Sequence, residues 1–224
     1  MKIIAHIRTD FPTKFGVPRQ SGLVKELTGK IILEPEFRDP EAVRGLEEFS
    51  HIWLLWQFSE AKTEHFSATV RPPRLGGNTR VGVFATRSPF RPNNIGLSSV
   101  KLDHIEFDKN LGPILHVSGI DLMDNTPIYD IKPYIPYVDS HPEAKEGFTS
   151  ITKGYALEVI LPEAVNCPFE GKQKDAMLGM LTQDPRPSYK NDKDREYGVE
   201  FAGYDIHFKV KDNILTVKDI VKMS

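Results

Sequence analysis

The chain of 224 residues contains a single cysteine, Cys167, and no long apolar run. One cysteine can form neither an internal disulfide nor a cysteine-rich metal cluster within the chain. The longest apolar stretch, near Ile52 to Phe58, is much shorter than the roughly 20 residues that a membrane-spanning helix needs. The chain begins with a strand-like segment and lacks the apolar core of a signal peptide, so we expect a cytoplasmic protein that does not enter a membrane.

Motifs of several common enzyme classes are also missing. No G-x-G-x-x-G follows a strand and no Walker-type phosphate loop occurs, which argues against a Rossmann-type nucleotide or methyl-donor site. The sequence has no H-E-x-x-H and no closely spaced set of histidines and cysteines, so we expect no metal. Because no G-x-S-x-G elbow is present, serine-dependent acyl transfer has no support.

Acidic residues are absent from His65 to Val100, although the whole chain has a formal net charge of −2. In or next to this window lie Arg71, Arg74, Arg80, Arg87, Arg91 and Lys101. Guanidinium groups present planar forks of donors that suit phosphate and carboxylate oxygens. The prolines and glycines between them bend and stiffen the backbone. We therefore interpret this segment as a surface that receives an anion.

Much of residues 1–140 has the pattern of short strands separated by proline and glycine turns. We predict strands at Ile3–Ile7, Ile52–Phe58, Arg80–Ala85, Leu97–Phe107, Ile114–Ser118 and Ile128–Ile131. The apolar run from Ile52 predicts a strand that is buried on both faces. Asp39 before Pro40 predicts the start of a helix that ends near Phe49. Many strands and little helix favour a barrel or a strongly curved sheet.

The pattern changes beyond a small polar linker at 140–150. We predict a strand at Tyr155–Leu161, a helix at Gly171–Leu181, and a hairpin that alternates through Tyr204–Val210 and Ile214–Val217. The predicted fold class is therefore mainly β, with a first domain at 1–140 and a small α+β domain at 150–224.

Two further segments combine turn-forming residues with functional side chains. Residues 16–20 form an early loop with an arginine and an amide, and residues 124–127 form a tight turn in which Asn125 tolerates a positive φ. Asp130, Lys132 and Tyr134 then occupy alternate positions, so an extended chain places them on one face. This alignment predicts a reaction pocket, and an exposed ion pair worth about 0–1 kcal/mol is the plainer alternative.

These segments resemble one family, the TsaA-like (TrmO) tRNA N6-adenosine methyltransferases that use S-adenosylmethionine. The matching strings are V-P-R-Q (17–20), A-V-R-G-L-E-E-F-S-H-I-W (42–53), V-R-P-P-R-L-G-G-N-T-R-V-G-V-F-A-T-R-S-P-F-R-P-N (70–93), I-G-L-S (95–98), D-N-T-P-I-Y-D-I-K-P-Y (124–134) and Q-D-P-R-P-S-Y (183–189). The resemblance implies a single-sheeted β-barrel followed by a small C-terminal domain. It also implies a homodimer that binds the methyl donor on the barrel, near the subunit interface.

The resemblance further implies which residues bind the donor. By motif, these are Pro18, Arg19, Gln20, Arg87, Leu97, Asp124, Asn125, Thr126 and Pro127, with Ser59 and Glu60 as backbone contacts. Ser59 and Glu60 stand where the family commonly has His-Gln, and Asn125 replaces the usual glycine. A turn accepts Asn at left-handed angles, although its side chain would weaken binding if the donor approached the backbone there.

The implied acceptor is N6 of N6-threonylcarbamoyladenosine at position 37, next to the anticodon in the tRNA anticodon loop. Asp130 or Tyr134 would accept the N6 proton, with Lys132 tuning the charge. Arg91 would hold the threonine carboxylate.

The remaining basic residues are assigned to RNA binding. Facing the tRNA phosphates would be Arg71, Arg74, Arg80 and Lys101, with Arg186 either contacting RNA or bracing the barrel. Two alternatives stay open: a barrel that binds RNA or nucleotides without catalysis, and a methyltransferase that acts on another acceptor.

Overall fold

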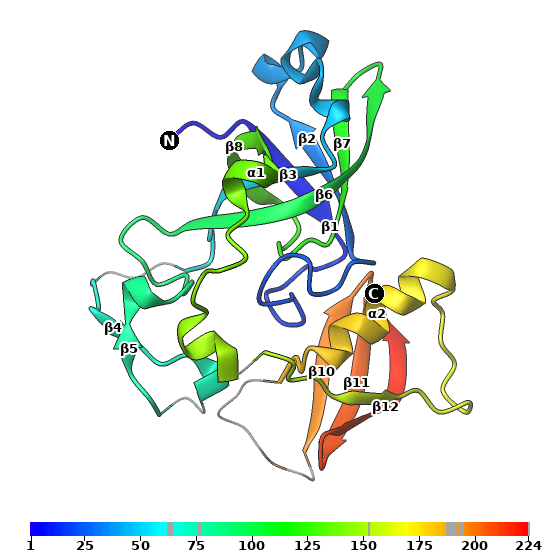
Figure 1. The fold of residues 1–224 in the computed structure, drawn as a ribbon. Helices are drawn as coiled ribbons and strands as arrows, with labels where there is room; N and C mark the ends of the chain where they lie inside the picture. Colours follow the sequence, from blue (N-terminus) through cyan, green and yellow to red (C-terminus); the bar gives the residue numbers. More distant parts are fainter. Residues whose placement is uncertain (62–64, 76–77, 152, 187–191, 193–194, 224) are drawn as a thin grey trace.

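The computed structural model describes residues 1–224 except 62–64, 76–77, 152, 187–191, 193–194 and 224 (Figure 1). Its N-terminal part is a closed antiparallel barrel with the strand order β1-β2-β7-β6-β3-β8. The strands are β1 (Ala5–Thr9), β2 (Thr28–Leu33), β3 (His51–Gln57), β6 (Ile95–Asp108), β7 (Gly112–Ser118) and β8 (Thr126–Pro133). The single-sheeted barrel is therefore confirmed. Of these strands, β2 is the one that the sequence pattern did not reveal.

Side chains alternate along the strands, so one set of them fills the apolar interior of the closed sheet. In β3, Ile52, Leu54 and Trp56 are buried in the core, whereas Trp53 and Leu55 between them stay partly accessible. The prediction that this strand is buried on both faces is therefore wrong. In a barrel, one face of each strand fills the interior and the other forms the outer wall.

A β-bulge changes the register between β3 and β8. Leu55 pairs with Asp130, but the next residue, Trp56, pairs with Ile128, so Tyr129 is the extra residue. Bulges bend a strand and redirect its side chains. Tyr129 consequently donates its hydroxyl hydrogen to the side-chain oxygen of Gln57, at 2.7 Å.

The segment from residue 35 to residue 48 contains short 3-10 helices instead of the single helix that was predicted. They are η1 (Pro35–Phe37), η2 (Pro40–Val43) and η3 (Leu46–Glu48). Asp39 caps η2 as expected, because its carboxylate accepts a hydrogen bond from the Glu41 N–H at 3.0 Å. The helix cannot continue through Gly45, whose φ is +80°.

The connection from β3 to β6 forms a separate small element with its own hairpin. Strand β4 (Thr69–Val70) pairs with β5 (Val81–Gly82), and the short helices η4 (Pro73–Leu75) and η5 (Val83–Ala85) accompany them. The strand predicted at Arg80–Ala85 is therefore correct only over β5, because the chain coils into η5 directly afterwards. We call residues 59–94 the insertion.

The C-terminal lobe, residues 158–222, is a four-stranded sheet with one helix. Its strands are β9 (Glu158–Ile160), β10 (Glu196–Phe201), β11 (Tyr204–Lys211) and β12 (Ile214–Lys222), in the order β10-β11-β12-β9, and its helix is α2 (Gly171–Thr182). The predicted hairpin and helix are confirmed. Between barrel and lobe lie α1 (Pro136–Asp139) and η6 (Gly147–Ile151). In the part of the chain that the structure describes, no helix has the length and apolar character to cross a bilayer.

Barrel and lobe share one hydrophobic core. Phe11, just after β1, packs against Phe201 of β10 with ring centroids 5.4 Å apart. The Ala202 N–H donates to the Asp10 carbonyl at 2.9 Å. Gly16 approaches β10 and α2 so closely that a Cβ there would lie 2.6 Å from the Val199 side chain. The early loop is thus held against the lobe.

Candidate active site

The segments predicted to bind the donor meet at the barrel end where β1 and β3 finish and β6 and β8 start, which we call the rim. Ser59 and Glu60 form an exposed turn just after β3. Asn94 ties this turn to the start of β6, because its side-chain amide donates to the carbonyls of Ala61 and Pro89, each at 2.7 Å. The insertion therefore leaves the rim and returns to it at neighbouring points.

The turn from Asp124 to Pro127 lies beside the end of β1. The Asp124 carboxylate accepts a hydrogen bond from the Thr9 N–H at 2.9 Å and lies 3.2 Å from the Arg8 guanidinium. Asn125 has φ +60°, which is the left-handed conformation that the sequence predicts for it. Thr126 is buried, and its hydroxyl donates to the Met123 carbonyl at 2.9 Å. Hydrogen bonds at both ends therefore hold this turn against the end of β1.

A polar network crosses the rim, centred on Asp121. The Trp56 indole N–H donates to the Ser98 hydroxyl oxygen at 2.9 Å, and the Ser98 O–H donates to the Asp121 carboxylate at 2.6 Å. The Ser21 N–H also donates to Asp121, and the positive charge of Arg87 acts on it. Arg87 in turn donates to the side-chain oxygen of Gln20. The early loop, the insertion, β3 and β6 thus converge on one carboxylate.

The electrostatics of Asp121 are set mainly by desolvation. Burial raises the pKa of Asp121 to about 6, and the hydrogen bonds from Ser98 and Ser21 and the charge of Arg87 oppose that rise. Sequence reasoning did not select this residue as a site residue. The available signal was a lone carboxylate between Ile120 and Leu122, which are both buried.

The I-G-L-S string has a packing explanation. A Cβ on Gly96 would lie 2.3 Å from the Trp56 indole, so only glycine lets the ring lie across β6. Ser98, two residues further on, faces the same interior and accepts the indole N–H. Leu97 lies between them, points outward and is 49% exposed. The string therefore positions one buried hydroxyl and one outward apolar side chain.

The outer wall brings the predicted donor and catalytic residues into one row. Leu55 pairs with Leu97 on one side and with Asp130 on the other. Neighbouring strands lie about 4.8 Å apart, so the row crosses three strands in roughly 10 Å. Two residues before Leu55, on the same face of β3, Trp53 pairs with Ser99 and Lys132. The donor candidate Leu97 and the catalytic candidates therefore share one surface.

The three catalytic candidates make contacts along the same outer wall. Asp130 and Lys132 form an ion pair at 2.9 Å. The Tyr134 ring packs against Trp53 with centroids 5.6 Å apart, and the Trp53 N–H donates to Asp139 at 2.9 Å. The structure thus gathers a carboxylate, an ammonium and a phenol on the outer face of β8. Their roles in a reaction remain a prediction.

The basic residues of the insertion differ in how firmly they are held. Arg91 donates from one nitrogen to the carbonyls of Val83 and Thr86, at 3.1 and 2.7 Å, and so braces η5. Arg80 donates to the Thr69 hydroxyl oxygen at 2.9 Å. Arg71 is exposed. The side chain of Arg74 lies outside the described residues.

Two further candidates for RNA binding are engaged in ion pairs. Lys101 lies 2.8 Å from the Asp103 carboxylate. Arg186 forms a fork with Asp184, with Nε and Nη2 each 2.8 Å from a carboxylate oxygen, and the Tyr155 hydroxyl donates to Asp184 at 2.7 Å. The Arg186 pair is largely buried in the C-terminal lobe. These contacts lie in the C-terminal part of the chain, so they favour a bracing role within that part and not the predicted bracing of the barrel.

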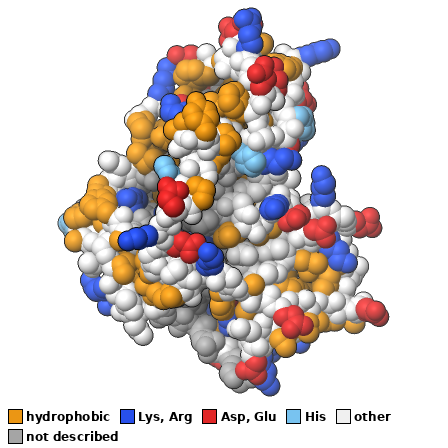
Figure 2. Space-filling model, viewed as in Figure 1, with side chains coloured by type: hydrophobic (Ala, Val, Ile, Leu, Met, Phe, Trp, Pro, Cys, Tyr) orange, Lys and Arg blue, Asp and Glu red, His pale blue; other side chains and the backbone are white. Residues whose placement is uncertain are grey.

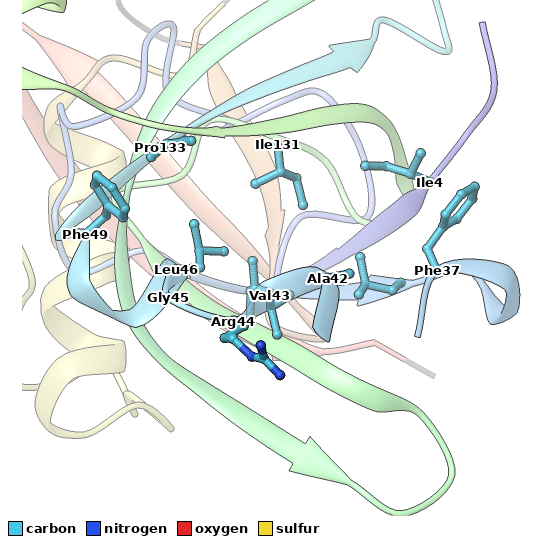
Figure 3. A pocket seen from close by; sticks show the side chains of 12 residues that line it. Ile4, Phe37, Ala42, Val43, Arg44, Gly45, Leu46, Phe49, Ile131 and Pro133 are labelled. Carbon is cyan, nitrogen blue, oxygen red and sulfur yellow. The ribbon is translucent and has the colours of Figure 1, made fainter. Parts of the chain in front are cut away.

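An apolar cavity of about 550 Å³ lies at the barrel end opposite the rim (Figure 3). Its walls come from the 35–49 segment and from the end of β8, where Ile131 and Leu46 point toward each other. Arg44 is the charged residue in its lining, and it pairs with Glu41. The predicted donor and catalytic residues do not line this cavity. Within the described residues, no group of three or more His, Cys, Asp or Glu side chains could hold a metal ion.

These features define a non-Rossmann barrel whose rim combines a largely buried carboxylate, an arginine and exposed backbone turns. Comparison with family models identifies a known domain in each of the two parts of the chain. The tRNA-methyltransferase O N-terminal domain matches residues 6–140, and the TrmO C-terminal domain matches residues 167–223. The chain belongs to the tRNA-methyltransferase O family.

Individual relatives agree with this assignment. An Escherichia coli K12 protein named tRNA (adenine(37)-N6)-methyltransferase is 40% identical over 217 residues, which cover 93% of this chain and 92% of the relative. A Pseudomonas aeruginosa protein named "Putative S-adenosylmethionine-dependent methyltransferase RcsF" is 40% identical over 225 residues, or 97% and 95% of the two chains. The crystal structure of TrmO from Pseudomonas aeruginosa has a TM-score of 0.76 at 34% identity and covers 98% of this chain and 97% of that one.

Proposed function

We propose that the protein is a tRNA methyltransferase that transfers a methyl group from S-adenosylmethionine to N6 of N6-threonylcarbamoyladenosine at position 37. The names of the Escherichia coli and Pseudomonas aeruginosa relatives support the reaction and the donor. The observation that carries the proposal is the row across the outer wall. In this row, Leu55 pairs with Leu97 on one side and with Asp130 on the other, so a donor candidate and a catalytic candidate lie two strands apart.

The residues at the rim suit the chemistry of the donor. S-adenosylmethionine combines a carboxylate, cationic groups and an adenosine, and when bound it supplies an electrophilic methyl group. Arg87 and Gln20 offer donors for the carboxylate and ribose, and Asp121 offers compensation for positive charge. Leu97 offers an exposed apolar surface for a purine. Further contacts are assigned to Pro18, Arg19, Ser59, Glu60, Asp124, Asn125, Thr126 and Pro127.

The acceptor nitrogen needs help from a base. N6 of the modified adenosine lies between a purine and a carbonyl, so its lone pair is delocalised and its N–H proton must be lost or shared. Asp130 or Tyr134 accepts this proton, and Lys132 adjusts the charge of Asp130 through the 2.9 Å ion pair. Alignment of acceptor and donor supplies much of the remaining rate.

The insertion, together with Lys101 of β6, holds the RNA. Arg91 offers the edge formed by Nε and Nη2 to the threonine carboxylate, while Nη1 stays on the backbone. Anchoring of phosphates is assigned to Arg71, Arg74, Arg80 and Lys101. Such contacts weaken as salt rises. Arg186 braces the lobe through Asp184 instead of contacting RNA.

We also propose that the enzyme acts as a homodimer in the cytoplasm, where it meets tRNA. The resemblance to the family supports the dimer, and so does the partly apolar outer wall, where Leu97 is exposed beside Leu55. A second copy covering this wall would exclude water from the reaction site. The division into a barrel domain at 1–140 and a C-terminal domain at 150–224 belongs to the same proposal.

The test is transfer of a labelled methyl group from S-adenosylmethionine to bulk tRNA with and without threonylcarbamoyladenosine. Labelling of the modified tRNA alone supports the proposal. Donor binding without labelling of either tRNA would point to another acceptor, and absence of donor binding would point to a binding module.

The proton acceptor is tested separately by single-turnover transfer. Asp130→Asn should slow the step by about 10²–10⁴-fold if Asp130 is the base. Lys132→Met serves as the matched control, because it breaks the same ion pair and leaves the carboxylate in place. A rate for Asp130→Asn equal to that of the wild type would eliminate Asp130 as the base.

A further inference from the structure

The insertion carries phenylalanine side chains that face solvent. Phe66, Phe84 and Phe90 are 61%, 71% and 50% exposed. Aromatic rings are among the side chains that gain most from burial. Several exposed rings within one short segment indicate a surface that another molecule covers.

Two of these rings are held in a fixed arrangement. Phe66 and Phe84 lie with centroids 6.4 Å apart and planes at 28°, which is a stacked geometry. The guanidinium carbon of Arg91 is 5.6 Å from the centroid of Phe84, within the range of a cation–π contact. Arg91 is itself fixed by the carbonyls of Val83 and Thr86. The Phe66 and Phe84 rings and the Arg91 guanidinium therefore form one contiguous cluster.

The positive charge around these rings indicates what kind of molecule binds there. No acidic residue occurs from 65 to 100, and Arg71, Arg80 and Arg87 lie in the same window. Figure 2 shows hydrophobic and Lys or Arg side chains next to one another over β4 and β5, at the left of the view. A symmetric contact between this surface and the same surface of a second copy would bring two basic insertions together, which is unfavourable. Unpaired nucleotides offer flat apolar faces together with negative charge.

We propose that Phe66 and Phe84 form a stacking platform for unpaired bases of the RNA substrate that flank the methylated base, with Phe90 as a third exposed ring of the same segment. This inference rests on the proposed function and adds how the protein binds the anticodon loop of the RNA. The insertion begins and ends at the rim, where the Phe58 N–H donates to the Asn94 carbonyl at 2.9 Å. Phe84 also precedes by three residues Arg87, which contacts Gln20 at the rim, so the platform and the rim share one segment. Stacking tolerates any base, whereas the arginines supply the salt-dependent part of binding.

The probe is an anticodon stem-loop RNA that contains N6-threonylcarbamoyladenosine, with 2-aminopurine as the next base on its 3′ side. Phe84→Leu keeps an apolar side chain but removes the ring. It should weaken RNA binding by about 5- to 150-fold and relieve the quenching of 2-aminopurine. The affinity for S-adenosylmethionine and the salt slope should stay unchanged, because no phosphate contact is lost. Phe84→Trp should bind as the wild type does.

Phe107→Leu is the matched control. Phe107 is 63% exposed near the β6–β7 turn, away from the insertion. Equal RNA affinity in Phe84→Leu and Phe107→Leu would overturn the platform. Loss of self-association in Phe84→Leu by light scattering, with unchanged RNA affinity, would identify the surface as a contact between copies.

The wild type separates failure of the platform from failure of the proposed function. A wild type that methylates the modified RNA, beside a Phe84→Leu variant with normal RNA affinity, refutes the platform alone. A wild type that neither binds nor methylates this RNA refutes both.

Discussion

Asp121→Asn should stabilise the folded protein at neutral pH. Burial raises the pKa of Asp121 from 3.8 to about 6, so its ionised form is less favourable in the folded state than in the unfolded state. The difference of about 2.2 units corresponds to about 3 kcal/mol above pH 6, at 1.36 kcal/mol per unit. This figure is an upper limit, because the side chain stays partly accessible to water. Asparagine keeps an oxygen that accepts the Ser98 hydrogen bond, so this contact is not lost.

The pH dependence follows from the sign of that shift. A carboxyl whose folded pKa is raised costs stability as pH rises from 3.8 through 6, and the full cost is present above pH 6. The difference in the free energy of unfolding between Asp121→Asn and wild type should therefore be largest at pH 7.5 and shrink toward pH 4. Urea denaturation at pH 4, 6 and 7.5 measures it.

Asp108→Asn is a control of opposite sign. The N–H groups of Leu111 and Asn110 donate to Asp108 and lower its pKa, so that carboxylate adds stability that is lost as pH falls. Removing it should destabilise the protein at pH 7.5. The reasoning on Asp121 is refuted if Asp121→Asn lowers the free energy of unfolding by 1 kcal/mol or more at pH 7.5. The hydrogen bonds would then outweigh the cost of desolvation.

Three further substitutions test the packing and the charge of the site. Gly96→Ala places a methyl group against the Trp56 indole. Thermal unfolding should therefore show a loss of about 1–3 kcal/mol in the free energy of unfolding, and an unchanged Tm would mean that the ring can move aside. Gly16→Ala adds a side chain at φ +85° and within 2.6 Å of Val199, and we expect weaker S-adenosylmethionine binding by calorimetry along with lower stability. Arg71→Ala should reduce the slope of log affinity for tRNA against log salt by about 1; an unaltered slope would remove this residue from the phosphate contacts.

The sequence revealed those parts of the fold that depend on local patterns. Alternation in β6 and β11 and the apolar run of β3 each predicted a strand that the structure contains. The cap at Asp39 was also correct, because it depends on neighbouring residues only. The helix beyond it was wrong, since Gly45 adopts a left-handed conformation that the composition of the segment does not reveal.

Features that depend on contacts between distant segments could not be predicted from sequence. The pKa of Asp121 reflects burial among the early loop, the insertion and β6, which only the folded chain brings together. The bulge at Tyr129 requires the register with β3. The fork between Arg186 and Asp184 was equally invisible, because a charged residue in a turn is normally solvated. Residues predicted by motif, such as Gln20 and Arg87, do lie in contact.

The close approach of Gly16 to the C-terminal lobe couples the early loop of the barrel to the packing of the lobe. Met180 of α2 and Val199 of β10 form the wall against which the early loop rests. Loosening this wall would release the loop, so barrel and lobe should lose structure in one cooperative step instead of two. If the rim binds the methyl donor as proposed, substitutions in the lobe that do not touch the donor should alter its affinity. Natural variation in α2 and β10 thus offers a route to adjust the enzyme without changing its reacting groups.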